Sequence, residues 1–171
     1  MNYHNITKDD MLNGEGLRVV LWVSGCEHQC KECHNPITWN PEDGLLFDEA
    51  AKQEIFNELE KDYVSGITFS GGDPLHHKNI VDVFRLIYEI AVKFPNKTVW
   101  MYTGYTWEEI SENDDLLLDM ASFVDVLVDG KFEKEKSDVN YHWAGSTNQR
   151  VIDVQKTLET GNIVLYETGV M

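Results

Sequence analysis

Short apolar runs alternate along this sequence with stretches of helical periodicity, and this alternation restricts the chain to one class of fold. The run Leu17–Ser24 is almost wholly apolar and β-branched, which is typical of a strand buried on both faces. Apolar residues then recur at helical spacing within 47–61. The two patterns continue to alternate, predicting strands at 66–70, 98–103 and 123–128 and helices at 79–94 and 107–121. We therefore predict an α/β fold with a mostly parallel sheet and right-handed crossovers.

The length and composition of the chain favour one globular domain. A chain of 171 residues with 42% hydrophobic residues can bury a substantial core. The alternation weakens after Asp129, where 131–148 is mixed and charged and 150–171 is compatible with a strand or a helix. We expect a single domain over 1–171, with a tail at 150–171 to which no role is assigned.

The charge of the chain argues against two classes of partner. The net charge is -16, from 30 Asp and Glu against 14 Lys and Arg, and such a chain would repel a phosphate backbone. The longest uncharged apolar run, Val19–Val23, is too short to span a bilayer, and the first residues lack the pattern of a signal peptide. We expect a cytoplasmic protein that binds neither nucleic acid nor membrane. Acidic residues are dense within 42–62, where a solvated helix face is favoured over a docking patch.

All the cysteines of the chain lie in one short motif, C-x₃-C-x₂-C, formed by Cys26, Cys30 and Cys33 directly after the first predicted strand. Three cysteines so close together cannot all pair as disulfides, and this spacing is typical of metal ligation. Four-iron clusters are usually held by four cysteines. An intramolecular cluster here would therefore leave one iron open to an exogenous ligand, such as the amine and carboxylate of an amino acid.

Two other interpretations of the cysteines stay open. A zinc site of the Cys₃His type could use His28 or His34, and buried reduced thiols could have no special role. Zinc sites more often use two cysteine pairs, or a cysteine pair with a histidine pair, so the iron–sulfur cluster is favoured.

A second motif, Ser70-Gly-Gly-Asp-Pro74, follows the strand predicted at 66–70. Successive glycines let backbone pass close to a ligand, although the same residues also make ordinary turns. Because ligands of parallel sheets bind at the carboxyl ends of the strands, we expect four loops to converge there, namely 25–33, 71–74, 103–105 and 129–131.

Other motifs give no support for further chemistry. The sequence has no phosphate-binding loop, and 13–16 lacks both the third glycine and the preceding strand of a dinucleotide site. The histidines show no spacing typical of a Ser-His-Asp site. His76 and His77 are expected to be surface turn residues.

Together, five motifs resemble those of the activating enzymes of anaerobic ribonucleoside-triphosphate reductase, which belong to the radical S-adenosylmethionine superfamily. The resemblance runs from the first residues to about Gln149, and the cysteine triad identifies the superfamily while the later motifs narrow it. The motifs are CEHQCKECHN at 26–35, SGGDP at 70–74, YTGY at 102–105, VDGKF at 128–132 and WAGSTNQ at 143–149. The resemblance implies a partial, open (βα)₆ barrel with the cysteine loop at its rim.

Site roles are implied position by position. Cys26, Cys30 and Cys33 would hold a [4Fe-4S] cluster. Contacts with S-adenosylmethionine are implied for Glu32, Cys33, His34, Gly71, Gly72 and Asp73, and more weakly for Thr103, Asp129 and Lys131. His34 stands where the family often has an aromatic residue, and Ala144 replaces an arginine often found before Gly-Ser.

The resemblance also implies the reaction and the partners. The reduced cluster would cleave S-adenosylmethionine, and the resulting 5′-deoxyadenosyl radical would take a hydrogen from one glycine of the reductase, leaving a glycyl radical. The implied partners are the glycine-bearing loop of the reductase large subunit and a flavodoxin-type electron donor. The alternatives are an activase of another glycyl-radical enzyme, a small radical S-adenosylmethionine synthase, and a non-enzymatic zinc-binding module.

Overall fold

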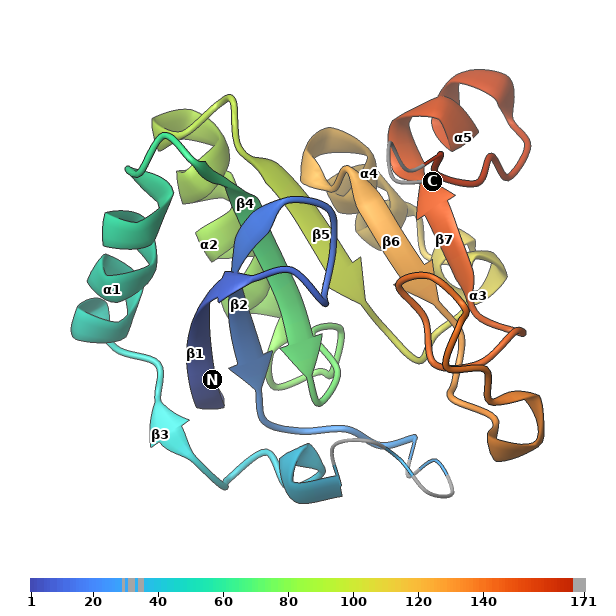
Figure 1. Cartoon of the computed structure of the whole chain (residues 1–171), viewed down its shortest axis with the longest axis horizontal. Helices are drawn as coiled ribbons and strands as arrows, with labels where there is room; N and C mark the ends of the chain where they lie inside the picture. The colour runs from blue at the N-terminus through green and yellow to red at the C-terminus, as the bar shows by residue number, and fades with distance from the viewer. Residues whose placement is uncertain (29, 31–32, 34–35, 168–171) are drawn as a thin grey trace.

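A seven-stranded sheet forms the centre of the molecule (Figure 1). The computed structural model describes residues 1–28, 30, 33 and 36–167. The strands, in the spatial order β3-β1-β2-β4-β5-β6-β7, are β1 (Asn2–Asp10), β2 (Leu17–Val23), β3 (Leu45–Leu46), β4 (Val64–Gly71), β5 (Thr98–Tyr102), β6 (Val126–Asp129) and β7 (Arg150–Asp153). The helices of the described residues are α1 (Glu49–Leu59), α2 (Ile80–Lys93), α3 (Trp107–Ser111), α4 (Asp114–Phe123) and α5 (Val154–Thr160), with short 3₁₀ turns η1 (Pro36–Thr38) and η2 (Lys134–Lys136).

The four central strands are parallel and the flanking strands are antiparallel to their neighbours. β2 pairs with β4, β4 with β5, and β5 with β6 in parallel, whereas β1, β3 and β7 join in antiparallel fashion. The expected α/β alternation and the parallel core of the sheet are therefore confirmed, but the sheet as a whole is mixed. The partial (βα)₆ barrel stays a prediction from the resemblance.

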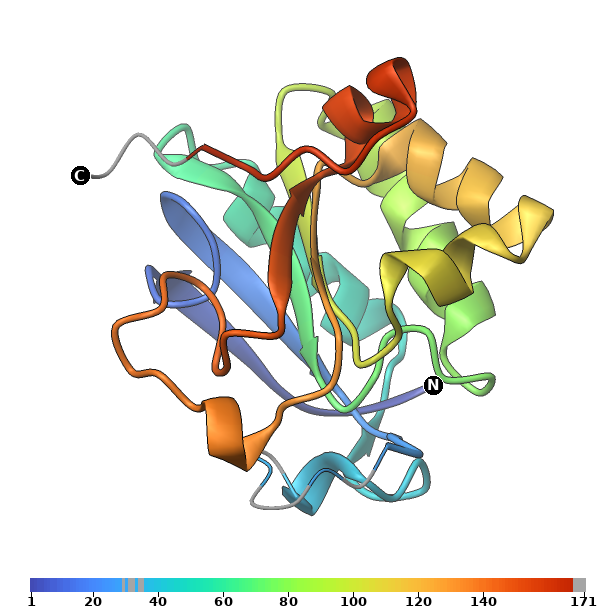
Figure 2. The same cartoon turned by 90° about the vertical axis from the view of Figure 1, so that its right-hand side faces the viewer.

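The two faces of the sheet have different partners. Alternate residues of the strands, such as Leu21, Phe69 and Met101, pack into the main core with buried residues of the helices. The helices thus cover one face of the sheet (Figure 2). On the other face, Trp100 and Val128 belong to a smaller apolar cluster against which residues of loop segments pack. This helix-free face leaves room for a binding site.

A buried arginine joins the beginnings of three parallel strands. Arg18 is only 1% exposed and donates hydrogen bonds to the Thr68 hydroxyl at 2.9 Å and to the carbonyls of Ile67 and Thr98 at 2.8 Å each. Its guanidinium lies 5.6 Å from the centre of the Trp100 ring. Burial lowers the pKa of Arg18 to about 10, so the side chain is charged at neutral pH. These bonds stabilise the edge of the sheet opposite the cysteine motif.

The structure differs from the predicted elements in several places, and the short strand β3 is one that was not predicted. The helix predicted at 107–121 is two helices, because the Asn113 side chain accepts a hydrogen bond from the Leu116 amide and begins α4 anew. β6 begins at Val126 rather than at residue 123, after α4 has ended at Phe123. β1 was not predicted, so a strand does precede 13–16, contrary to expectation. The tail forms β7 and α5.

The acidic stretch 42–62 is largely engaged in local contacts. Asp48 caps α1 by accepting a hydrogen bond from the Ala51 amide at 2.9 Å. Glu54 pairs with Lys8 at 3.2 Å, and Glu58 pairs with Lys61 at 2.9 Å. These contacts support the interpretation as a solvated helix face. Among the described residues, no helix has the length and apolar character needed to cross a bilayer.

Candidate functional site

Three of the predicted loops meet the cysteine motif in one cavity at the carboxyl end of the parallel strands. The cavity has a volume of about 590 Å³, within the range of roughly 300–1,000 Å³ usual for small-molecule sites. Cys26, Cys30 and Cys33 all line it, each half-buried and free of disulfides. Its other lining residues include Gly71, Gly72, Asp73, Thr103, Gly104, Gly130 and Lys131. The predicted convergence is therefore confirmed for these residues, whereas Glu32 and His34 lie outside the described residues.

The base of the cysteine loop is fixed by backbone hydrogen bonds. The Gly25 amide donates to the carbonyl of Thr38 at 2.6 Å, and the Cys26 amide donates to the carbonyl of Trp39 at 3.0 Å. Gly25 has φ of +105°, a conformation that favours glycine. The chain thus turns out of β2 at Gly25 and returns at η1, which holds the entry and the exit of the loop side by side.

Gly71 and Gly72 allow the end of β4 to approach this base. A Cβ at Gly71 would lie 2.7 Å from the Val23 carbonyl oxygen, and one at Gly72 would lie 2.5 Å from that of Gly25. The Gly72 amide donates to Val23 at 2.7 Å. The two glycines are therefore needed for strand-to-loop packing, and their predicted contact with S-adenosylmethionine stays a prediction.

Asp73 joins the cysteine loop to the ends of β4 and β5. Its carboxylate is only 2% exposed and accepts hydrogen bonds from the Thr103 hydroxyl at 2.8 Å, from the Gly104 amide at 3.0 Å and from the Leu75 amide at 2.9 Å. The His28 Nε2 atom lies 2.6 Å from Asp73 Oδ2. The carboxylate is thus occupied within the chain, and its predicted role toward the methionyl end of S-adenosylmethionine stays a prediction.

His28 packs into a space left by a glycine. A Cβ at Gly104 would clash with the His28 ring, and the Tyr105 ring meets it edge-on at 4.6 Å between centroids. Sequence reasoning considered His28 only as a zinc ligand. Its contacts with Asp73, Gly104 and Tyr105 instead anchor the cysteine loop to the rest of the cavity.

The Cys30 thiol lies partly buried near Cys33 and Lys131. Burial raises the pKa of the Cys30 thiol, and the neighbouring Cys33 acts in the same direction, while a backbone hydrogen bond at Phe132 and the charge of Lys131 oppose this shift. Metal ions strongly favour the deprotonated form of a thiol. Cysteine thiolates are the usual donors to iron–sulfur clusters, and the three cysteines that line the cavity are the described residues that would hold one.

Two buried donors in the cavity wall have no hydrogen-bond partner among the described residues. They are the Tyr102 hydroxyl and the Trp143 indole N–H. Burial raises the pKa of Tyr102, so the hydroxyl keeps its proton and acts as a donor. Neither atom has exposed surface, so both lie behind the wall of the cavity and do not face its open space. Sequence reasoning did not select either side chain.

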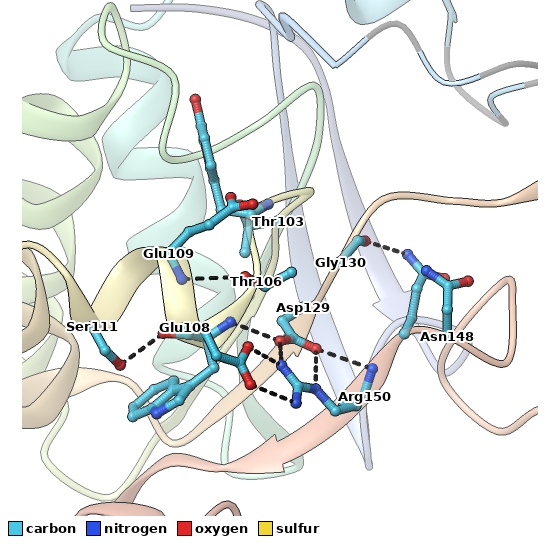
Figure 3. A network of polar contacts seen from close by, with 12 residues as sticks. Thr103, Thr106, Glu108, Glu109, Ser111, Asp129, Gly130, Asn148 and Arg150 are labelled. Atoms are coloured by element: carbon cyan, nitrogen blue, oxygen red, sulfur yellow. Dashed lines mark hydrogen bonds and ion pairs between the residues drawn. The ribbon is translucent and has the colours of Figure 1, made fainter.

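Asp129, a weaker candidate for the same pocket, has a structural role instead. Its carboxylate is 1% exposed and accepts hydrogen bonds from the Trp107 amide at 2.8 Å and from the Arg150 guanidinium at 2.5 Å (Figure 3). Arg150 also binds Glu108 through two hydrogen bonds of 2.7 and 3.0 Å. This network joins β6, β7 and the beginning of α3. Of the weaker candidates, Thr103 and Lys131 line the cysteine cavity and Asp129 does not.

Glu27, His76 and His77 form a polar cluster beside the cysteine loop. The Glu27 carboxylate lies 3.4 Å from His76 Nε2 and 3.2 Å from His77 Nδ1. The Lys78 amide donates to His76 Nδ1 at 3.1 Å, which places the proton of a neutral ring on Nε2, toward Glu27. His77 is exposed as predicted, but the prediction for His76 was wrong, because this ring is buried against the loop.

Comparison with known proteins agrees with the geometry of the cavity. Residues 12–152 match the protein family described as "4Fe-4S single cluster domain". This match favours iron–sulfur over the zinc interpretation and covers all three cysteines.

Several named relatives align with most of the chain. The "Anaerobic ribonucleoside-triphosphate reductase-activating protein" of Enterobacteria phage T4 is 42% identical over 151 residues, which is 88% of this chain and 93% of that relative. Proteins of the same name from Escherichia coli (strain K12) and Haemophilus influenzae are each 40% identical, and cover 88% and 87% of this chain and 97% and 96% of their own lengths. The chain therefore belongs to the family of anaerobic ribonucleoside-triphosphate reductase-activating proteins.

Proposed function

We propose that this protein activates an anaerobic ribonucleoside-triphosphate reductase, as its named relatives do, and that it carries a [4Fe-4S] cluster on Cys26, Cys30 and Cys33. The observation that carries the proposal is the cavity in which three half-buried cysteines, none in a disulfide, meet the ends of β4 and β5. When bound, the cluster and S-adenosylmethionine would supply a one-electron cleavage that yields a 5′-deoxyadenosyl radical, which takes hydrogen from a glycine of the reductase.

The residues of the chain would bind and orient these groups. With only three cysteines in the whole chain, a four-iron cluster would have one iron without a cysteine ligand, and the amine and carboxylate of S-adenosylmethionine suit that position. His28 and Asp73 fix the loop that bears the cysteines. The (βα)₆ type of partial barrel is part of the same proposal.

Further elements of the proposal concern the electron donor and the compartment. A flavodoxin-type protein is the proposed reductant, by the resemblance to the family. The free thiols suit a reducing compartment, which supports a cytoplasmic location.

The direct test of the function is electron-spin resonance on the partner. After anaerobic reconstitution and reduction, the protein with S-adenosylmethionine should produce the doublet of a glycyl radical on purified reductase. The Cys30→Ala variant should bind much less iron and produce no doublet, because a ligand of the cluster is missing.

The alternatives predict other outcomes. Cleavage of S-adenosylmethionine without a doublet on the reductase would favour an activase of another glycyl-radical enzyme or a small synthase. A colourless protein with one zinc ion would favour the zinc-binding module and contradict the proposal.

A further inference from the structure

Three exposed apolar side chains surround the same cavity that holds the cysteines. Met11 and Leu12, in the turn between β1 and β2, are 64% and 83% exposed, and Val139, between η2 and β7, is 97% exposed. All three line the cysteine cavity, although they come from opposite ends of the chain. We call Met11, Leu12 and Val139 the apolar rim.

The apolar rim lies on the open side of the molecule. Figure 2 shows the β1–β2 turn and the segment between β6 and β7 on the face of the sheet that the helices leave uncovered. A large partner can therefore approach the cavity from this side without displacing a helix.

The turn that carries Met11 and Leu12 is held in a fixed shape. Asp10 accepts hydrogen bonds from the amides of Leu12 at 2.8 Å and Asn13 at 2.9 Å. The Thr68 hydroxyl donates to the carbonyl of Asn13 at 2.6 Å, which fastens the turn to β4. The two apolar side chains are thus presented to solvent by ordered backbone.

The segment that carries Val139 is also held in place by hydrogen bonds. The Asp138 amide donates to the Gly145 carbonyl at 3.2 Å, and the Thr147 amide donates to the Lys136 carbonyl at 2.9 Å. The Gln149 side chain accepts from Gly145 at 2.9 Å and donates to Gly130 at 2.9 Å. Val139 lies within a closed loop, and little conformational entropy would be lost when a partner covers it.

The proposed reaction indicates which protein covers the apolar rim. On the proposed function, the substrate is one glycine of a large protein, and a cavity of about 590 Å³ can admit a loop but not the body of that protein. The surface around the opening must therefore touch the reductase whenever the glycine is inside. Exposed apolar side chains that line such an opening favour an interaction site there, because covering them removes apolar surface from water.

We propose that Met11, Leu12 and Val139 form the docking rim for an apolar surface of the reductase beside its glycine-bearing loop. This inference rests on the proposed function and adds the surface by which the partner is recognised.

The test compares rim variants with matched variants on the helix-covered side. Leu12→Asp and Val139→Asp each place a carboxylate in an interface that is dry when formed, which is costly. Each should raise, by about tenfold or more, the reductase concentration that gives half-maximal glycyl-radical formation, and the dissociation constant measured by sedimentation should rise in parallel. Val81→Asp on α2 and Leu118→Asp on α4 are the controls, since these residues are 65% and 66% exposed. They should leave both quantities unchanged.

Iron content and thermal midpoint of all four variants, measured first, should equal those of the unmodified protein. The proposal is overturned if rim and control variants give the same half-saturating concentration, or if the rim variants bind the reductase normally but form fewer radicals. If the unmodified protein neither binds the reductase nor forms a radical on it, the proposed function and the docking rim fail together. Normal activation by every variant would contradict the docking rim and leave the proposed function intact.

Discussion

Asp73 and His28 connect the cysteine motif to the sheet through a small set of side-chain hydrogen bonds. The Asp73 carboxylate accepts from Thr103, Gly104 and Leu75, and His28 Nε2 lies 2.6 Å from it. Such charge-assisted bonds in a buried setting are stronger than neutral ones. In addition to the backbone hydrogen bonds at its base, the loop is therefore held by His28, which is not among the proposed cluster ligands.

We predict that His28→Ala loosens the cluster without preventing folding. Losing the bond to a buried carboxylate should lower the free energy of unfolding by about 2 kcal/mol and speed iron loss to a chelator about tenfold. His28→Gln should restore much of both, because its amide can donate to Asp73. Gln53→Ala, at an exposed position of α1 that does not line the cavity, is the control. Equal rates of iron loss in all three variants would contradict the anchoring role.

The residues of the site were predictable to different degrees. Cys26, Cys30 and Cys33 were found because three thiols within one loop have few other uses. The glycines of the SGGDP motif were selected, but the structure shows that they bring β4 against Val23 and Gly25. The bond between His28 and Asp73 could not be predicted, because it joins residues 45 positions apart whose proximity depends on the tertiary fold.

Among the helices and strands, the buried strands were predicted well, whereas a half-exposed strand and the break between two helices were missed. β2 is almost wholly apolar and β4, with Val64, Ile67 and Phe69 between Ser, Thr and Gly, is almost wholly buried; both were predicted within a few residues. β1 was missed because this strand is mostly half-exposed and polar in sequence, next to the edge strand β3. The break between α3 and α4 follows from the cap at Asn113, a signal that the Asn-Asp-Asp sequence did contain.

The network of Glu108, Asp129 and Arg150 predicts a pH effect at the junction of α3, β6 and β7. Arg150 lowers the pKa of Glu108 from 4.5 to about 2. A depressed carboxyl pKa stabilises the fold above the unfolded value, and this contribution is lost as the pH falls from about 4.5 through about 2. Because the Glu108 side chain is 61% exposed, the contribution should stay below about 1 kcal/mol.

Unfolding by denaturant, compared between the unmodified protein and Glu108→Gln, would measure this contribution. The difference in free energy should be constant above about pH 5.5 and should shrink toward pH 2. Glu109→Gln is the matched control, since its carboxylate forms no ion pair with any of the described residues. A difference that grows on acidification would contradict the assigned ion pair.

In the whole molecule, one face of the sheet carries the main hydrophobic core and the other carries the proposed site. The helices pack the main core on one face of the sheet, while the other face carries the smaller apolar cluster, the cysteine cavity and the apolar rim. The α/β class could be predicted because alternating strands and helices have few ways to pack. The antiparallel strands β3 and β7 could not, because each pairs with a strand distant in sequence, and β1 could not, because it lacks an apolar pattern although it pairs with the next strand.

The central claim is that three cysteines hold a four-iron cluster whose remaining iron accepts S-adenosylmethionine. The most direct measurement is the electron-spin resonance spectrum of the anaerobically reconstituted, dithionite-reduced protein, recorded with and without S-adenosylmethionine. The cluster signal should change shape when S-adenosylmethionine is added, because the ligand would bind the iron itself. An iron-free protein, or a cluster signal that S-adenosylmethionine leaves unchanged, would contradict it.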